Sequence, residues 1–317
     1  MKVVLAGEGS AATQVFQALQ QRQIPLVAVL TSPPDPKDRS AGGLWKIVSR
    51  AGLEPWPAKL VKDPGLAERL RAIDPDILLN VYSLYLIREE ILTVPPLGSY
   101  NLHPGPLPKY AGLNSMCWAI YRGERRHGVT VHQMVPEVDA GPIVFQETFA
   151  IEDEDTGLSV ATKCIEVGVA LILRLLEAAQ SPLGIPRVPQ DLGERDYFGR
   201  EVPQEGRIRW AVSARNVFNF VRACDFHPFP SPWGHPKTFC RSRQIAVTKT
   251  SLTGKPCHVP PGTAGSVTAA GAEVACRDEW LLVQRIQVGK KSCSPLDVIR
   301  PGDELKTANE CAPLVGM

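Results

Sequence analysis

The feature that most constrains the fold is a change of pattern near residue 190 of the 317-residue chain. Before that point, short apolar runs alternate with stretches whose apolar residues recur at helical spacing. The runs that predict strands are 2–7, 26–32, 76–82, 98–103, 128–134 and 143–151, and the helix-like stretches include 44–52, 64–72, 85–92 and 157–179. This alternation predicts an α/β fold with an open, mostly parallel, Rossmann-like sheet.

The second part of the chain has a different composition. Residues 181–206 are rich in proline, glycine and charge, as linkers are. A helix is predicted at 211–223, and short strand-like runs follow at 244–249, 265–269, 273–276 and 279–288. These runs predict a small β-rich, barrel-like (OB-like) domain. We therefore expect an α/β domain at 1–189, a linker at 190–205 and a β-rich domain at 206–317, since one core seldom organises 317 residues.

Composition excludes several classes of protein. No apolar run approaches the roughly 20 residues of a membrane helix, so no membrane partner is expected. The N-terminus reads MKVVLAGEGS, a strand and a turn rather than a secretory signal, which favours a cytoplasmic protein. The eight cysteines form no C-x-x-C pair, so we expect reduced, mostly buried thiols and no metal site.

Charge is unevenly distributed along the chain, whose formal net charge is +2. Residues 1–199 contain 19 Lys and Arg against 23 Asp and Glu, a balance of −4. Residues 200–317 contain 16 against 10, a balance of +6. The second part could therefore attract RNA or a phosphate-bearing substrate, although a mildly basic surface without a partner fits equally well.

GEGSAA at residues 7–12 follows a strand and opens a helix, as a dinucleotide-binding turn would. The second strand, however, ends in Thr31-Ser32-Pro33 and supplies no carboxylate for a ribose. A tight turn without a cofactor is the better interpretation. The loop that follows, 32–43, is rich in proline and glycine.

The stretch NLHPGPLPKYAGLN, residues 101–114, is the strongest functional candidate. Asn101 and His103 stand two apart at a strand end, so their side chains point to one side, and ligands of open α/β sheets bind at such ends. Pro104 restricts the backbone of His103. Asp139 lies in the turn PEVDAGPIV. Alone, each residue suits a cap, a core histidine or an Asx-turn, but their joint appearance favours catalysis.

Two further histidines have structural interpretations. His132 alternates with Thr130 on a predicted strand, and we interpret it as structural, with lining the site as the alternative. His127 follows Glu124, Arg125 and Arg126, which favours a solvated charge cluster.

The motifs together resemble one protein family. N-x-H-P-x-x-L-P-x-Y-x-G (101–112), G-V-T-x-H-x-M (128–134) and D-A-G-x-I (139–143) are similar to motifs of the formyltransferases that use 10-formyltetrahydrofolate. That family includes methionyl-tRNA formyltransferase and sugar N-formyltransferases. DYFGREVPQEGRIRW (196–210) and FVRACDFHPFPSPW (220–233) extend the resemblance to the second domain.

The resemblance implies a formyltransferase with catalytic Asn101, His103 and Asp139, with 10-formyltetrahydrofolate as donor and no metal. Asn101 and a protonated His103 would donate hydrogen bonds to the developing oxyanion, while Asp139 would favour the imidazolium and help to remove the amine proton. The residues implied to bind the folate are Tyr82, Leu84, Leu86, Val138, Ala140 and Gly141.

The chain departs from the family pattern on the side expected to face the acceptor. Where relatives usually have Ser-Leu-Leu-Pro, this chain has Gly105-Pro106-Leu107-Pro108, and Ala111 replaces an arginine. The residues expected on the acceptor side are Gly105, Pro106, Ala111 and Gly112.

These departures favour a small-molecule amine acceptor, either an amino sugar nucleotide or an amino acid derivative. Methionyl-tRNA is the alternative acceptor, supported by the basic second part, although loop 32–43 carries only Lys37 and Arg39 as cations. A non-catalytic folate or nucleotide sensor and a formate-releasing hydrolase are alternatives of other classes.

Overall fold

The structure, a computed structural model, describes residues 1–35 and 42–307. Part of the loop expected at 32–43 and the end of the chain from residue 308 lie outside the described residues. The chain divides into two compact units. Unit 1 contains residues 1–115, 127–149 and 161–198, and unit 2 contains residues 116–126, 150–160 and those from 199 onward.

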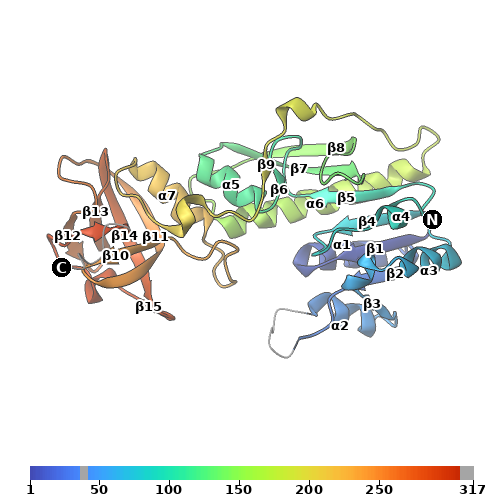
Figure 1. Ribbon diagram of the computed structural model, residues 1–317, viewed down its shortest axis with the longest axis horizontal. Coiled ribbons are helices and arrows are strands. Elements are labelled where there is room, and N and C mark those ends of the chain that lie inside the picture. The colour runs from blue at the N-terminus through green and yellow to red at the C-terminus, as the bar shows by residue number, and fades with distance from the viewer. Residues whose placement is uncertain (36–41, 308–317) are drawn as a thin grey trace, which may run out of the picture. The chain divides into compact units, whose positions relative to one another are not determined.

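Unit 1 is built on a seven-stranded sheet with the order β3-β2-β1-β4-β5-β7-β8 (Figure 1). Its strands are β1 Val3–Gly7, β2 Leu26–Thr31, β3 Pro55–Pro57, β4 Ile77–Val81, β5 Ser99–His103, β7 Arg126–Gln133 and β8 Ile143–Ala150. The neighbours from β3 to β5 pair in parallel, whereas β7 runs antiparallel to β5. The predicted open, mostly parallel sheet is confirmed.

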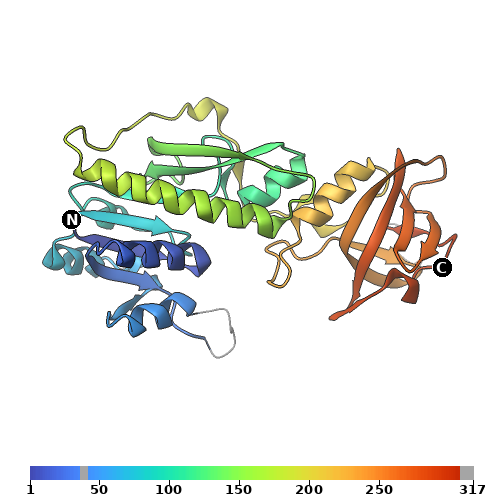
Figure 2. The ribbon, with the colours of Figure 1, turned by 180° about the vertical axis from the view of Figure 1, so that it is seen from behind.

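Helices cover this sheet. They are α1 Gly9–Gln21, α2 Gly43–Arg50, η1 Ala58–Lys62, α3 Gly65–Ile73, α4 Glu89–Leu92 and, from residue 161 onward, α6 Gly157–Gln180. Helix α5, Ser115–Arg122, belongs to unit 2 from residue 116 onward. Apolar residues of η1, α3 and α4 pack with β1, β2 and β4 in one buried cluster. Figure 2 shows α1 and α6 side by side in front of the sheet, where Arg22 Nη1 lies 3.2 Å from Glu177 Oε1. The helix predicted at 85–92 is shorter, and α5 was not predicted.

The last part of unit 1 follows α6. Residues Leu192–Glu194 form the short helix η2, and Tyr197–Phe198 form strand β9. Strand β9 pairs in parallel with β6, Ala111–Gly112. Residues 190–198, which the sequence assigns to a linker, are thus paired with and packed into unit 1.

Unit 2 contains a curled antiparallel sheet with the order β12-β13-β14-β11-β10-β16. Its elements are η3 Pro203–Gly206, α7 Ala214–Ala223, β10 Lys237–Cys240, β11 Arg243–Pro256, β12 Ala264–Thr268, β13 Gly271–Ala275, β14 Glu279–Val288, β15 Lys291–Cys293, η4 Pro295–Asp297 and β16 Leu305–Lys306. An isolated bridge between Thr263 and Glu304 joins its two edges. Val217 and Val221 of α7 pack into the core of this sheet. The predicted β-rich, barrel-like domain is confirmed.

The seven cysteines of the described part are thiols that form no disulfide with one another, and six of them are buried. Among residues 1–35 and 42–307, no helix has both the length and the apolar character that crossing a membrane requires.

Candidate functional site

The site begins where two neighbouring strands of unit 1 face each other. Asn101 pairs with His132 across β5 and β7, and His103 pairs with Thr130. Because alternate residues of a strand share a face, Asn101 and His103 point to the same side, and His132 lies opposite Asn101. The pairing brings the strand-end residues of β5 next to a histidine from β7.

Asp139 joins these side chains. Its Oδ1 accepts a hydrogen bond from Asn101 Nδ2 (3.3 Å) and lies 3.3 Å from His132 Nε2. Its Oδ2 lies 3.4 Å from His103 Nδ1 and accepts from the Gly112 backbone N–H at 2.9 Å. Burial alone would raise the pKa of Asp139, but His103, His132 and the Gly112 N–H together hold it well below its usual value. The carboxylate is therefore ionised inside the protein.

His103 is buried, with 3% of its surface exposed. Its Nε2 lies 2.7 Å from the Tyr110 carbonyl oxygen, which can only accept, so Nε2 carries the proton. Burial lowers the pKa of His103, and the opposing effects of Asp139 and the Tyr110 carbonyl only partly offset it. His103 is thus neutral at neutral pH, with Nδ1 free of a proton. This corrects the expectation that Asp139 keeps an imidazolium in the resting site.

The amide of Asn101 has a defined orientation. Its Oδ1 accepts from Asn80 Nδ2 at 2.9 Å, which turns Nδ2 towards His132 Nε2 (3.1 Å) and Asp139. Asn80 lies beside Asn101 in the parallel pairing of β4 and β5. Sequence reasoning missed Asn80, although it is the one polar residue of the strand ILLNV. His132 lines the site, which was the alternative to its structural interpretation.

Hydrogen bonds hold the loop that follows His103. The Thr130 hydroxyl donates to the Gly105 carbonyl (2.7 Å) and accepts from the Leu107 N–H (3.1 Å). Gln146 Nε2 donates to both the Leu107 carbonyl and the Thr130 hydroxyl, each at 2.8 Å. The stiffness expected from the prolines is therefore reinforced by side chains of β7 and β8.

His127 is buried, with 1% of its surface exposed, so its assignment to a solvated charge cluster is wrong. Arg126 at the start of β7 is exposed, whereas His127 and the five residues that follow it are buried. Its Nε2 donates to the Pro104 carbonyl at 2.9 Å, and the Ser115 hydroxyl donates to the same oxygen. Burial lowers the pKa of His127 to about 4.

A His127→Gln variant is expected to lose less stability than the wild type as the pH is lowered. The unfolded histidine takes up a proton near its ordinary pKa, about 6.5, whereas the folded one resists protonation down to about pH 4. The free energy of unfolding of the wild type should therefore decrease as the pH decreases through this window, and His127 should contribute on the order of 3 kcal/mol to the decrease. Urea unfolding at several pH values between 7 and 4 measures the slope of the free energy of unfolding against pH. Equal slopes for both proteins would contradict the prediction.

The residues expected to bind folate fall into two groups. Leu84 and Leu86 are 68% and 71% exposed, so they present apolar surface next to the end of β4. Tyr82 has a positive φ of 58°, and its buried hydroxyl has no hydrogen-bond partner among the described residues. Val138 and Ala140 are half-buried on either side of Asp139. Gly141 is buried, and a Cβ there would lie 1.8 Å from the Gln133 carbonyl, so packing explains this glycine.

The residues expected on the acceptor side mostly face inward. Ala111 is fully buried, so its side chain cannot contact an acceptor in this structure, which corrects that expectation. A Cβ on Gly105 would lie 2.6 Å from His103 Nε2, and a Cβ on Gly112 would lie 2.2 Å from the Phe198 carbonyl oxygen. Pro106 is half-buried. The missing side chains therefore make room for His103 and for strand β9.

GEGSAA forms a tight turn, as interpreted. A Cβ on Gly7 would lie 2.6 Å from both the Ala12 Cβ and the Val81 carbonyl oxygen, so close packing requires glycine. The Glu8 carboxylate accepts hydrogen bonds from the N–H and hydroxyl of Ser32, each at 2.7 Å. This places a negative charge beside the first turn of α1, where a dinucleotide phosphate would bind.

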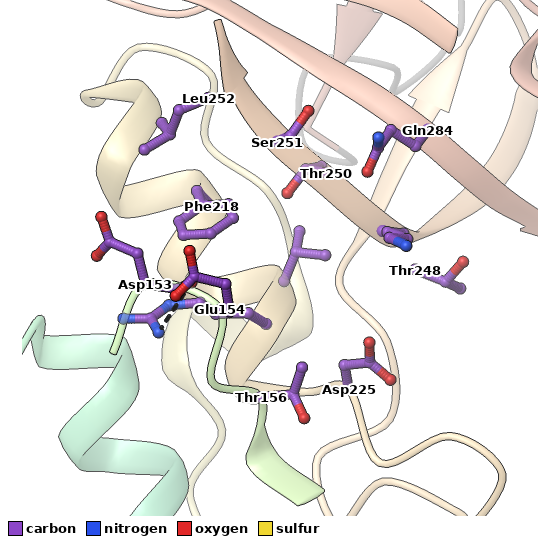
Figure 3. Close-up of a pocket in the computed structure, with 13 residues that line it drawn as sticks. Asp153, Glu154, Thr156, Phe218, Asp225, Thr248, Thr250, Ser251, Leu252 and Gln284 are labelled. Carbon is purple, nitrogen blue, oxygen red and sulfur yellow. Dashed lines mark hydrogen bonds between the residues drawn. The ribbon is translucent and has the colours of Figure 1, made fainter. Parts of the chain in front are cut away.

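Unit 2 contains a cavity of about 540 Å³ (Figure 3). Thr250 and Ser251 of β11, Gln284 of β14 and Phe218 of α7 are among the side chains around it. The buried Arg222 lies in its wall and donates to backbone carbonyls of residues 152 and 155. None of the residues that surround Asp139 lines this cavity.

Comparisons with known proteins identify the family to which both parts of the chain are similar. The family described as Formyl transferase matches residues 1–176, and Formyl transferase, C-terminal domain, matches residues 202–301. Residues 177–201 lie between the two matched ranges.

Solved structures share the fold. An N-formyltransferase from Helicobacter canadensis, in complex with folinic acid and dTDP-3-aminofucose, superposes with a TM-score of 0.70 at 18% identity, covering 90% of this chain and 99% of that one. WlaRD, a sugar 3N-formyl transferase in the presence of dTDP and 5-N-formyl-THF, gives 0.68 at 17% identity, covering 92% and 98%. A variant of HypX from Aquifex aeolicus gives 0.62 at 18% identity, and this chain, 94% covered, spans only 46% of that protein.

Proposed function

Because this chain belongs to the formyl transferase family, we propose that it transfers a formyl group from 10-formyltetrahydrofolate to the primary amine of a small molecule. The observation that carries this proposal is the buried, ionised carboxylate of Asp139, which contacts Asn101, His103 and His132. Formyl transfer needs a donor for the oxygen that becomes negative and a group that accepts the proton of the amine. The cluster supplies both.

The chemistry follows from the hydrogens and lone pairs that the groups of the site can offer. The amine nitrogen attacks the formyl carbon, and the carbonyl oxygen gains negative charge. Asn101 Nδ2, whose two hydrogens face His132 Nε2 and Asp139 Oδ1 in the resting site, can stabilise this oxygen by turning one of them towards it. His103 Nδ1 takes the proton from the amine. The resulting imidazolium lies between two acceptors, Asp139 and the Tyr110 carbonyl. The bond between the formyl carbon and the nitrogen of the donor then breaks, and that nitrogen takes up the proton that His103 accepted, which returns His103 to its neutral form and gives the formamide and tetrahydrofolate.

The surroundings support a folate donor. The exposed Leu84 and Leu86 offer an apolar surface of the kind that binds a planar heterocycle. The Helicobacter canadensis and WlaRD structures hold formylated folates. Among the acceptor classes, an amino sugar nucleotide is favoured, because one of these proteins binds dTDP-3-aminofucose and the other was solved with dTDP. The balance of +6 over residues 200–317 keeps methionyl-tRNA as the second candidate.

A formyl-transfer assay with a panel of amines tests this proposal. The protein would be incubated with 10-formyltetrahydrofolate and, separately, dTDP-3-aminofucose, other amino sugar nucleotides, amino acids and methionyl-tRNA. We expect tetrahydrofolate release to require an amino sugar nucleotide. Turnover with methionyl-tRNA alone would establish the second candidate. Formate release without an amine would indicate a hydrolase, and folate binding without any turnover would indicate a sensor.

A further inference from the structure

The segment 188–198, here called the strap, is fixed to unit 1 at both ends. At its start, Val188 and Ile143 exchange two backbone hydrogen bonds, each of 2.8 Å. At its end, Tyr197 and Phe198 form strand β9 against β6. The strap is therefore an ordered part of unit 1, although its composition is that of a linker.

The strap holds the turn that carries Asp139. Gln190 Nε2 donates to the backbone carbonyls of Asp139 (2.9 Å) and Gly141 (2.6 Å). Arg195 donates through Nη2 to the Val138 carbonyl (2.6 Å) and through Nη1 to Glu137 Oε1 (2.9 Å). Two side chains of the strap thus bind the carbonyls of three of the four residues 138–141.

The backbone of Asp139 needs such support. Its φ is +54°, a left-handed conformation that is unfavourable for residues with a Cβ, although aspartate adopts it more readily than most. Gln190 binds the carbonyl of Asp139 itself and that of Gly141 two residues later, so it bridges the strained position. Without this bridge, the turn could relax and move the carboxylate away from His103.

The strap also holds the Tyr110 carbonyl, which is the hydrogen-bond partner of His103 Nε2. The Ala111 N–H donates to the Asp196 carbonyl (2.8 Å), and the Leu113 N–H donates to the Phe198 carbonyl (2.8 Å). The rings of Tyr110 and Phe198 stack with centroids 5.5 Å apart. These contacts fix the Tyr110 carbonyl against His103 Nε2.

We propose that Gln190 and Arg195 are positioning residues for formyl transfer, which keep the Asp139 carboxylate against His103 without touching substrate. This inference rests on the proposed function for its effect on rate. Its structural content, the distance between Asp139 and His103, is independent of turnover. The titratable groups that face His103 are Asp139, His132 and His127.

Replacing Gln190 with leucine tests the role of the strap, because leucine keeps the bulk and removes both hydrogen bonds. We expect kcat to fall by about 10- to 100-fold while KM for 10-formyltetrahydrofolate stays within about threefold. Asp139 raises the pKa of His103, so loosening Asp139 should shift the acid limb of the pH–rate profile to lower pH. Arg195→Lys, which keeps the charge and one donor, should retain more activity than Arg195→Met.

The matched control is Gln287→Leu, which removes a similar bond, from Gln287 Nε2 to the Gly289 carbonyl, in unit 2. It should leave the rate and the pH profile unchanged. The titration of the His103 imidazole, followed by NMR in wild type and Gln190→Leu, needs no turnover, so it tests the strap even if no amine is formylated. The proposal would be overturned if His103 titrated in Gln190→Leu as it does in wild type. It would also be overturned if the rate fell only in proportion to the loss of folded protein while the pH profile stayed unchanged.

Discussion

Replacing Asn101 or His103 with alanine is expected to lower kcat/KM for formyl transfer by about 10² to 10³, or roughly 2.7–4 kcal/mol. The Asn101→Ala variant lacks the donor for the developing oxyanion, and the His103→Ala variant lacks the nitrogen that accepts the proton of the amine. Asn101 is bound by Asn80, His132 and Asp139, so its loss also frees three partners. Steady-state kinetics with the amine identified by the panel assay measures both effects.

The fold should survive these changes, and circular dichroism and thermal unfolding of each variant check this. Asn216→Ala is a suitable control, because Asn216 has an exposed side chain in the first turn of α7. It should behave as wild type. Near-normal kinetics in either purified site variant would refute the catalytic assignment, whereas loss of folded protein would call for the milder changes Asn101→Ser and His103→Gln.

Replacing Gly105 with alanine is expected to lower kcat by about 10² through displacement of His103, an effect of the size caused by the loss of one preorganised group. The new Cβ would lie 2.6 Å from His103 Nε2 and 2.7 Å from the Tyr110 carbonyl oxygen, closer than such atoms can approach. The loop cannot easily yield, because Thr130 binds the carbonyl of Gly105 and the N–H of Leu107. The imidazole must therefore move. Kinetics and the His103 NMR signal measure the displacement.

Gly43→Ala is the matched control for this substitution. Gly43 begins α2 with nothing within 4 Å of an added Cβ, so alanine fits there. This variant should retain wild-type activity and equal or slightly higher stability. If Gly105→Ala also retained wild-type kcat, the close contact between position 105 and the imidazole would not limit catalysis.

The architecture was largely predictable from the sequence because the spacing of apolar residues along the chain changes where one kind of secondary structure gives way to another. Runs such as KVVLAG and DILLNVY are buried on both faces, as central parallel strands are. Two elements were less predictable. The eight residues of α5 are too few for a clear helical period. The second part of β11 is polar, and it is ordered as a strand through its pairing with β14.

The site was only partly predictable. Asn101, His103 and Asp139 could be named because they lie in a recognisable motif, and the structure brings them together. His132 and Asn80 complete the cluster through register, since each lies opposite or beside Asn101 in a neighbouring strand. Register depends on how distant segments pair, which local spacing does not specify. The protonation of His103 depends on burial, which the sequence motif does not reveal.

The position of the strap determines where this chain can be cut. A fragment that ends at residue 189 would keep Asn101, His103 and Asp139, yet it would lose Gln190, Arg195 and strand β9. A domain boundary should therefore not be placed at an arbitrary position between the two matched family ranges, in residues 177–201. Anyone who wishes to express the formyl-transfer half alone should carry the chain through Phe198.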